Sequence, residues 1–201
     1  MKKLKVCLLI GAVSLSTMAC ASAKKETSQT QAVNQPSVTI KEVNVDSIAA
    51  SEEESEYSFA PAELICSIPD GFNESEYDGE YLYKTYPKDV SSINQVISES
   101  DEDPTLKTEE EFIAEMQKEY KSAYGEDVTI NVTQYDNIVV DKRPGLWIMY
   151  NFDFRGEEYN VLMVILYNGT ESNYITYLQG PGADWMEDFV NSAMSISLKD
   201  L

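Results

Sequence analysis

The chain contains no histidine among its 201 residues. Histidine is the usual general base at neutral pH and the commonest zinc and copper ligand, so the sequence excludes Ser-His-Asp and Cys-His catalysis and any histidine metal site. Basic residues are also scarce, with 15 Lys and Arg against 35 Asp and Glu. Because affinity for nucleic acid depends on Lys and Arg neutralising phosphates, a chain of net charge −20 is not expected to bind it.

Cysteine is rare as well, with three in the chain. Cys7 lies within an apolar amino-terminal segment and Cys20 at its end, which leaves Cys66 alone in the remainder. No disulfide framework is therefore predicted. Cys66 lies between Ile65 and Ile68, and we expect it to be a buried small apolar residue.

The amino-terminal residues 1–19 have the pattern of a secretory signal. Three lysines within Met1–Lys5 precede the apolar run Val6–Leu15, which is too short to cross about 30 Å of hydrocarbon comfortably. Small residues then lead to Cys20, and this end resembles the lipobox of bacterial lipoproteins, in which the cysteine becomes the first mature residue and carries acyl chains. We therefore predict a lipoprotein signal at 1–19 and lipidation of Cys20 by palmitate or similar chains. The alternative is an ordinary signal peptide, because 19–21 and 21–23 also satisfy the small-x-small cleavage rule.

Residues 20–56 are predicted to be the lipidated cysteine and a flexible polar tether. Ala21–Glu56 holds no aromatic residue and is highly polar. It cannot bury enough apolar surface to compensate for the conformational entropy that it would lose on folding. A flexible chain of this length spans about 30–35 Å root-mean-square. Its one apolar alternation, Val38-Thr39-Ile40 followed by Val43-Asn44-Val45, could dock as a short edge strand. Without residues 1–19 the chain has 12 basic against 35 acidic residues, a net charge of −23, so an anionic membrane surface should repel its body.

Residues 57–201 are predicted to form one globular domain, because all 13 tyrosines, both tryptophans and all six phenylalanines lie there. A capping box at Thr108 and Glu111 begins a helix that Gly125 ends, and a second helix follows from Met186. The residues 161–166 are apolar on both faces, which predicts an interior strand. The expected strands are 63–68, 81–86, 93–98, 128–133, 146–154 (after a break at 142–145), 159–167 and 174–179. We therefore predict an α+β fold, with an antiparallel sheet of about six to seven strands sandwiched by two amphipathic helices.

The order of these elements and three short motifs resemble the PsbP-like superfamily. The motifs are Ser67-Ile68-Pro69-x-Gly71-Phe72, Thr108-Glu109-Glu110-Glu111-Phe112 and Trp185-Met186-x-x-Phe189-Val190. The resemblance covers roughly residues 57–198 and implies a fold commonly used as an adaptor or assembly factor, including in many bacterial lipoproteins. The superfamily shares no catalytic residue set, so the resemblance implies no functional position.

Two groups of side chains are candidates for binding. The acidic stretch Glu99–Asp103 offers oxygen ligands suited to calcium but lacks the EF-hand pattern, and we interpret it as a solvated loop with calcium left open. Tyrosine combines an apolar ring with a polar tip and is common at interfaces, although it is also simply a good strand residue. Tyr81, Tyr83, Tyr174 and Tyr177 are our candidates for an interaction surface.

No catalytic residue, metal ligand or cofactor site is predicted. The leading hypothesis is a lipid-anchored protein of the extracytoplasmic membrane face, acting as a non-enzymatic binding or assembly module. Its expected partners are the membrane, through the acyl chains of Cys20, and an envelope protein or cell-wall component. The alternatives are a small-ligand or carbohydrate receptor accessory to a transporter and, third, a metal-assisted enzyme.

Overall fold

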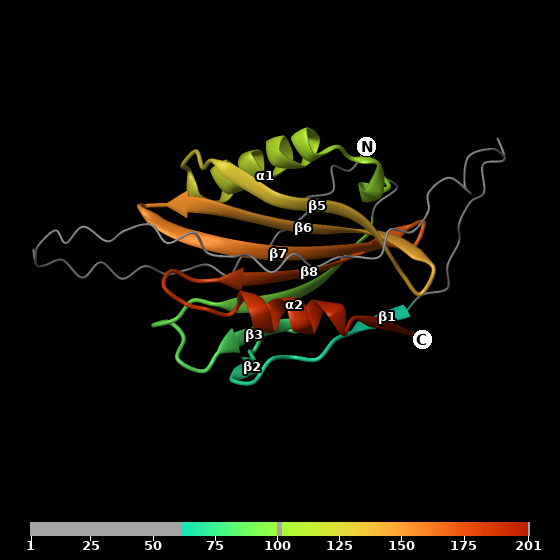
Figure 1. Cartoon of the computed structure of the whole chain (residues 1–201), viewed down its shortest axis with the longest axis horizontal. Coiled ribbons are helices and arrows are strands. Elements are labelled where there is room, and N and C mark those ends of the chain that lie inside the picture. Colours follow the sequence, from blue (N-terminus) through green and yellow to red (C-terminus); the bar gives the residue numbers. More distant parts are fainter. Residues whose placement is uncertain (1–61, 100–101, 201) are drawn as a thin grey trace, which may run out of the picture. The chain divides into compact units, whose positions relative to one another are not determined.

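The computed structural model describes residues 62–99 and 102–200 (Figure 1). The predicted signal, Cys20 and the tether lie outside the described residues, as do the first residues of the predicted domain, 57–61. Ser100 and Asp101 of the acidic stretch lie outside them too.

Seven strands form one antiparallel sheet in the order β2-β3-β4-β8-β7-β6-β5. A two-stranded antiparallel ribbon pairs β1 with β9. Two α-helices and a short 3-10 helix complete the described chain, so the predicted α+β fold is confirmed. The bounds are β1 Ala62–Ile65, β2 Phe72–Glu74, β3 Glu80–Tyr83, β4 Ser92–Glu99, η2 Pro104–Leu106, α1 Glu109–Tyr124, β5 Ile130–Val140, β6 Arg143–Phe154, β7 Glu157–Tyr167, β8 Glu171–Gln179, α2 Met186–Met194 and β9 Ser197–Asp200.

β7 lies inside the sheet, between β6 and β8, and both of its faces are buried. Val161, Met163 and Ile165 join the cluster under α1, whereas Leu162, Val164 and Leu166 join the cluster under α2. The prediction of an interior strand at 161–166 is therefore confirmed. Each helix thus covers one face of the sheet, because alternate side chains of a strand point to opposite faces.

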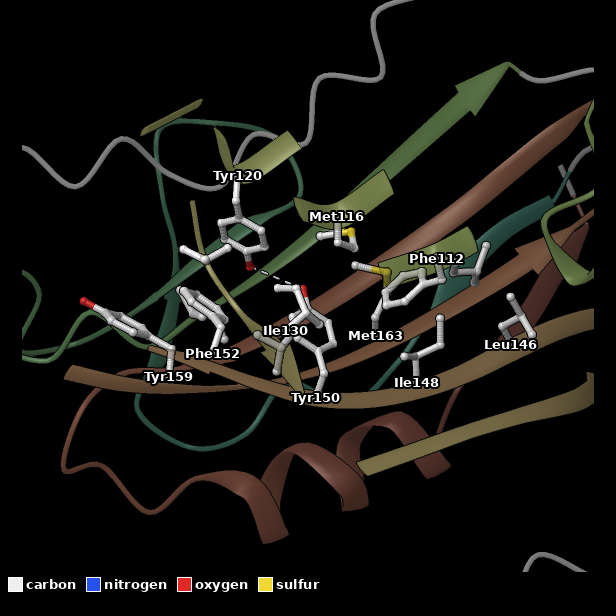
Figure 2. Packing of buried hydrophobic residues seen from close by; sticks show 14 residues of the cluster. Phe112, Met116, Tyr120, Ile130, Leu146, Ile148, Tyr150, Phe152, Tyr159 and Met163 are labelled. Atoms are coloured by element: carbon white, nitrogen blue, oxygen red, sulfur yellow. Dashed lines mark hydrogen bonds between the residues drawn. The ribbon is translucent and has the colours of Figure 1, made fainter. Parts of the chain in front are cut away.

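The face under α1 is packed with aromatic rings (Figure 2). Phe112, Met116 and Tyr120 point from α1 onto the sheet and are buried there. The hydroxyl groups of Tyr120 and Tyr150 lie 3.3 Å apart and share a hydrogen bond in this core. Burial raises the pKa of both phenols, so they are neutral at ordinary pH.

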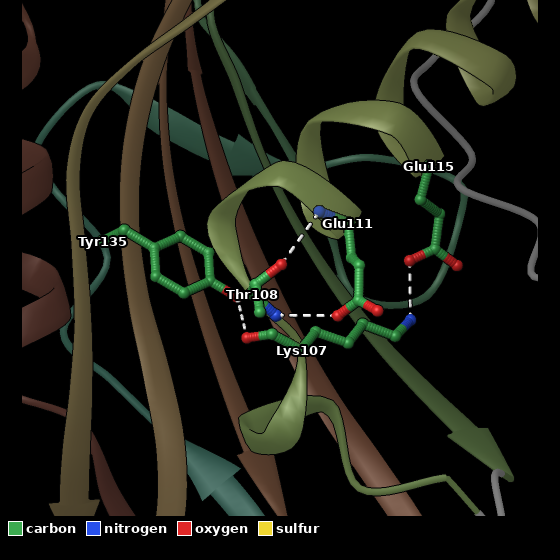
Figure 3. Close-up of polar contacts among 5 residues, drawn as sticks. All are labelled: Lys107, Thr108, Glu111, Glu115 and Tyr135. Carbon is green, nitrogen blue, oxygen red and sulfur yellow. Dashed lines mark hydrogen bonds and ion pairs between the residues drawn. The ribbon is translucent and has the colours of Figure 1, made fainter.

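The ends of α1 agree with the capping pattern in the sequence, and Figure 3 shows the cap at its first turn. The backbone N–H of Glu111 donates to Oγ1 of Thr108 at 3.3 Å, and the backbone N–H of Thr108 donates to Oε2 of Glu111 at 2.9 Å. At the other end Gly125 adopts the left-handed conformation, with φ 73°. The start of α1 is also fastened to β5, because the hydroxyl of Tyr135 donates to the backbone oxygen of Lys107 at 2.9 Å.

The turn between β5 and β6 differs from the prediction. The break was predicted at 142–145, but Asp141 and Lys142 make the turn with positive φ and β6 begins at Arg143. Pro144 is tolerated in β6 because it pairs only with β5 there, and the pairing with β7 starts one residue later. Gly145 allows the strands to approach closely, since a Cβ at this position would collide with the carbonyl oxygen of Ile165.

Candidate functional site

The four tyrosines predicted as an interaction surface do not lie together. Tyr81 and Tyr83 of β3 are half-buried against the cluster under α2. Tyr177 lies on that same face but has 0% exposure, so it is a core residue. Tyr174 packs against the opposite cluster, under α1. Only Tyr81 and Tyr83 therefore remain near one another at a partly open position.

The hydroxyl of Tyr177 belongs to a structural chain of hydrogen bonds. It lies 3.0 Å from Oγ of Ser192, which itself donates to the backbone oxygen of Ser67 at 2.6 Å. Since the serine proton is used on that carbonyl, Tyr177 donates to Ser192. Burial raises the pKa of Tyr177, with the nearby Cys66 thiol adding to the effect. Cys66 is half-buried, more open than predicted, and its sulfur accepts from Nε2 of Gln95 at 3.3 Å.

The structure instead gathers aromatic rings around Trp185, at the start of α2. Phe72 of β2 and Tyr83 of β3 are cross-strand partners, and their ring centroids lie 5.4 Å apart. The ring of Trp185 lies 4.6 Å from that of Tyr83 and 5.4 Å from that of Phe72. Phe189, one helical turn after Trp185, closes the group at 5.4 Å from Phe72. We call Phe72, Tyr83, Trp185 and Phe189 the Trp185 cluster.

A single carboxylate holds this cluster in place. Nε1 of Trp185 donates to Oδ2 of Asp89 at 3.0 Å, and Oδ1 accepts from the backbone N–H and the hydroxyl of Ser91 at 2.9 and 2.6 Å. Oγ of Ser91 in turn accepts from the backbone N–H of Gly180 at 2.9 Å. The loop between β3 and β4 is thereby joined to the loop between β8 and α2. Burial raises the pKa of Asp89, but the hydrogen bonds from Ser91 and Trp185 outweigh it and the pKa of this carboxyl is lowered.

The loop 84–88 directly follows Tyr83 of the Trp185 cluster and carries cationic and aromatic side chains. Nζ of Lys84 lies 5.6 Å from the centroid of the Tyr83 ring, close enough for a cation–π interaction. Tyr86 is 37% exposed, and Lys88 is also exposed. Neither lysine forms an ion pair within the described ranges. Half-buried aromatic rings beside the Lys84 amine, with a second exposed lysine on the same loop, have the chemistry of a protein-binding surface, with an anchor and a charged rim.

A metal site needs several ligand side chains that lie together, and a membrane span needs a long apolar helix. Across 62–99 and 102–200, no three Cys, Asp or Glu side chains gather as metal ligands. In the acidic stretch, Oδ1 of Asp103 accepts from the backbone and hydroxyl of Thr105, at 2.8 and 2.7 Å, and so caps η2. Calcium binding by Glu99–Asp103 stays untested, since two of its residues are not described. Neither helix of the described chain is long and apolar enough to cross a bilayer.

Comparison with known proteins finds similarity in structure but not in sequence. No family model and no curated protein sequence matches the chain. The solution structure of cyanobacterial PsbP (CyanoP) from Synechocystis sp. PCC 6803 is similar, with a TM-score of 0.52 and 15% identity over 75% of this chain and 99% of that one. A weaker match is the crystal structure of LpqN, involved in cell envelope biogenesis of Mycobacterium tuberculosis, with a TM-score of 0.46 and 13% identity over 70% and 85% of the two chains. At such identities the likeness concerns the fold: this chain has a PsbP-like fold, as its motifs indicated.

Proposed function

We propose that the protein is a lipid-anchored extracytoplasmic module that works by binding another envelope component and not by catalysis. The observation that carries the anchor is the position of Cys20, directly after small residues at the end of a short apolar run. A single acyl chain gives only marginal membrane attachment, so stable anchoring needs more than one chain on this cysteine. The net charge of −23 beyond residue 19 keeps the domain itself away from an anionic lipid surface.

The observation that favours a binding role is the loop 84–88 beside the Trp185 cluster. Asp89 fixes the position of the Trp185 ring, which reduces the entropy lost when a partner contacts it. Lys84 and Lys88 would direct an anionic group of a partner protein to this rim. The alternative of a carbohydrate receptor is less favoured, because the rings of Tyr83 and Trp185 pack on each other and on Phe72 and do not form an open platform.

The anchor is tested by detergent-phase partitioning of membranes that contain the chain or its variants. The unmodified chain should enter the detergent phase, and Cys20→Ala should shift it to the aqueous phase. Cys66→Ala removes the thiol of the globular domain and should leave the partitioning unchanged. Equal partitioning of all three proteins would refute the lipid anchor.

The binding role is tested by photocrosslinking in whole cells. A photoreactive phenylalanine derivative at Tyr86, beside Lys84 and Lys88, should give one discrete adduct. The same derivative at Tyr77, which is 66% exposed in the turn between β2 and β3, should not give that adduct. An absent adduct at Tyr86, or an identical one at both positions, would show that the loop 84–88 is not the binding surface.

A further inference from the structure

Four amide side chains form one row across the seven-stranded sheet. Asn131 of β5 is the cross-strand partner of Asn151 of β6, which pairs on its other side with Asn160 of β7. Asn160 in turn pairs with Gln179 of β8. These four strands are neighbours in the sheet (Figure 1), so the row crosses them without a break. Residues directly opposite each other in such pairs have Cβ atoms about 4.5–5.5 Å apart, which brings the four amides into one line.

The amide row lies on the face of the sheet that carries α2. The residues next to each amide in its strand belong to the cluster under α1, as Tyr150 and Phe152 do beside Asn151. Because alternate side chains of a strand point to opposite faces, the amides point away from α1. Gln179, at the inner end of the row, is 9% exposed, whereas Asn131, on the edge strand, is exposed. The two asparagines between them are half-buried, so the row opens toward β5.

Hydrogen bonds within the protein leave part of the amide row unused. Nδ2 of Asn131 donates to Oδ1 of Asn151 at 3.4 Å, and Oε1 of Gln179 accepts from the backbone N–H of Trp185 at 2.8 Å. Within 62–99 and 102–200, neither Nδ2 of Asn151 nor the side chain of Asn160 has a hydrogen-bond partner. A purely structural ladder of amides would bond from each side chain to the next. The middle of the row therefore has donors and an acceptor to offer to a ligand.

The rows on either side of the amides differ in chemistry. On one side Asp153 and Glu158 are cross-strand partners on the same face, and both are exposed. Neither forms an ion pair in the described part of the chain. On the other side Met149 is half-buried and packs against the cluster under α2. A ligand on the row thus meets an apolar side chain along one flank and negative charge along the other, which disfavours an anionic ligand.

A straight sugar chain fits this combination of spacing and chemistry. Neighbouring strands lie about 4.7–4.9 Å apart, and an extended β-linked sugar chain advances by nearly the same distance with each ring. Each ring has hydroxyl groups at its edges, which match the amides, and C–H groups on its faces, which match Met149. An acetamido substituent carries one N–H and one carbonyl, so it can exchange two hydrogen bonds with the free amide of Asn160. We propose that the amide row binds an uncharged β-linked chain of N-acetylated amino sugars that lies across β5, β6 and β7.

This inference goes beyond the proposed function, because it concerns a different surface. In the sheet order, β8 and β4 lie between β7 and β3, the strand that precedes the loop 84–88. The Trp185 cluster offers a sugar no open aromatic platform, whereas the amide row recognises it by hydrogen bonds. The lipid anchor and the loop 84–88 can therefore each fail their tests while this inference holds, and the reverse is also true.

The test is a titration of the isotope-labelled full chain with chitotetraose, followed through the side-chain amide signals in NMR spectra. The signals of Asn151 and Asn160 should shift and saturate at millimolar concentrations of the sugar. The signal of Asn137, which is exposed on the α1 face of β5, should not shift. Cellotetraose has the same linkage but no acetamido groups, and it should bind at least about threefold more weakly, the effect of losing one hydrogen bond.

Variants separate the amide row from the rest of the surface. Asn160→Ala removes the free amide and should weaken chitotetraose binding at least about threefold, whereas Asn137→Ala should not change it. Asn131→Ala acts at an exposed position that the fold does not need, and it should also weaken binding. Lys84→Ala alters the loop 84–88 and should leave binding unchanged. Urea unfolding of each variant checks that it remains folded.

Four outcomes would overturn the proposal. Unmoved signals of Asn151 and Asn160 would show that the row does not bind the sugar chain. An equal shift of Asn137 would show that the sugar contacts the surface without selectivity. Equal affinity for the two tetrasaccharides would show that acetamido groups are not recognised. Loss of binding in Lys84→Ala, with full binding in Asn160→Ala and Asn131→Ala, would move the sugar site to the loop 84–88.

Discussion

Replacing Asp89 by Asn tests how the Trp185 cluster is held. Asn has the same shape, and its oxygen can still accept from the backbone and hydroxyl of Ser91. Its amide group, however, turns a donor toward the indole N–H of Trp185, which now donates at 3.0 Å to a carboxylate. Hydrogen bonds to charged groups contribute about 1.5–3 kcal/mol, and the indole would lose its partner. We expect Asp89→Asn to lower the free energy of unfolding by about 1.5–3 kcal/mol.

Urea unfolding at pH 7, followed by circular dichroism and tryptophan fluorescence, measures this change. The matched control is Asp184→Asn, which removes an exposed carboxylate one residue before Trp185 and should cost less than about 0.5 kcal/mol. In a Trp185→Phe background, Asp89→Asn should cost clearly less than alone, because the two residues interact. Equal effects of Asp89→Asn and Asp184→Asn would refute the role of this hydrogen bond.

The dependence of stability on acidic pH is a second test of the hydrogen bond between Asp89 and Trp185. The folded state lowers the pKa of Asp89, whereas unfolding returns it to about 3.9. Its contribution to stability is therefore fully present above the unfolded pKa and is lost as pH falls through the folded pKa. The difference in unfolding free energy between the unmodified chain and Asp89→Asn should shrink below pH 4, and a constant difference would contradict the assignment.

Three further changes address the core. Phe189 has 0% exposure under α2, so Phe189→Ala leaves a cavity there and should lower the free energy of unfolding in urea by about 3–5 kcal/mol. Phe189→Leu should lower it less. A decrease under about 1 kcal/mol for Phe189→Ala would show that the surrounding side chains collapse into the cavity. The raised pKa of the buried phenols keeps them neutral in the folded state above pH 10, where they ionise in the unfolded state. The free energy of unfolding should therefore fall above pH 10 by about 1.4 kcal/mol per pH unit for each such tyrosine. Tyr150→Phe should reduce this slope, and an unchanged slope would contradict the role of the Tyr150 phenol. Ile165→Asp places an unpaired charge in β7 and should abolish cooperative thermal unfolding, so an unaltered melting curve would mean that β7 tolerates charge.

The parts of the fold that sequence could predict are those with a local cause. The ends of α1 follow from Thr108, Glu111 and Gly125, whose chemistry acts within a few residues. The interior position of β7 follows from an apolar run on both faces. β2 and β9 were not predicted, because three or four residues show too little periodicity, and the strands predicted at 63–68 and 81–86 extend beyond the equally short β1 and β3 for the same reason.

The candidate site was harder to predict because its contacts are distant in sequence. Asp89 and Trp185 are 96 residues apart, and nothing near either residue indicates the other. Alternation also cannot decide which tyrosine of a sheet is covered: Tyr81 and Tyr177 share a face, but only Tyr177 lies fully beneath α2. Which tyrosine is buried depends on the position at which α2 packs on the sheet, and this position is fixed only when the helix and sheet layers assemble.

The hydrogen bond between the Trp185 indole and Asp89 holds a fluorescent side chain next to the loop 84–88, so the protein carries its own fluorescent reporter. The other tryptophan, Trp147, is only 4% exposed within the core, so its emission should stay constant while the fold is intact. A molecule bound next to Lys84 would lie beside Tyr83, whose ring centroid is 4.6 Å from that of Trp185, and should alter the surroundings of the indole. Occupancy of this surface is therefore measurable as a change in emission wavelength, without a dye and without knowing in advance what the molecule is.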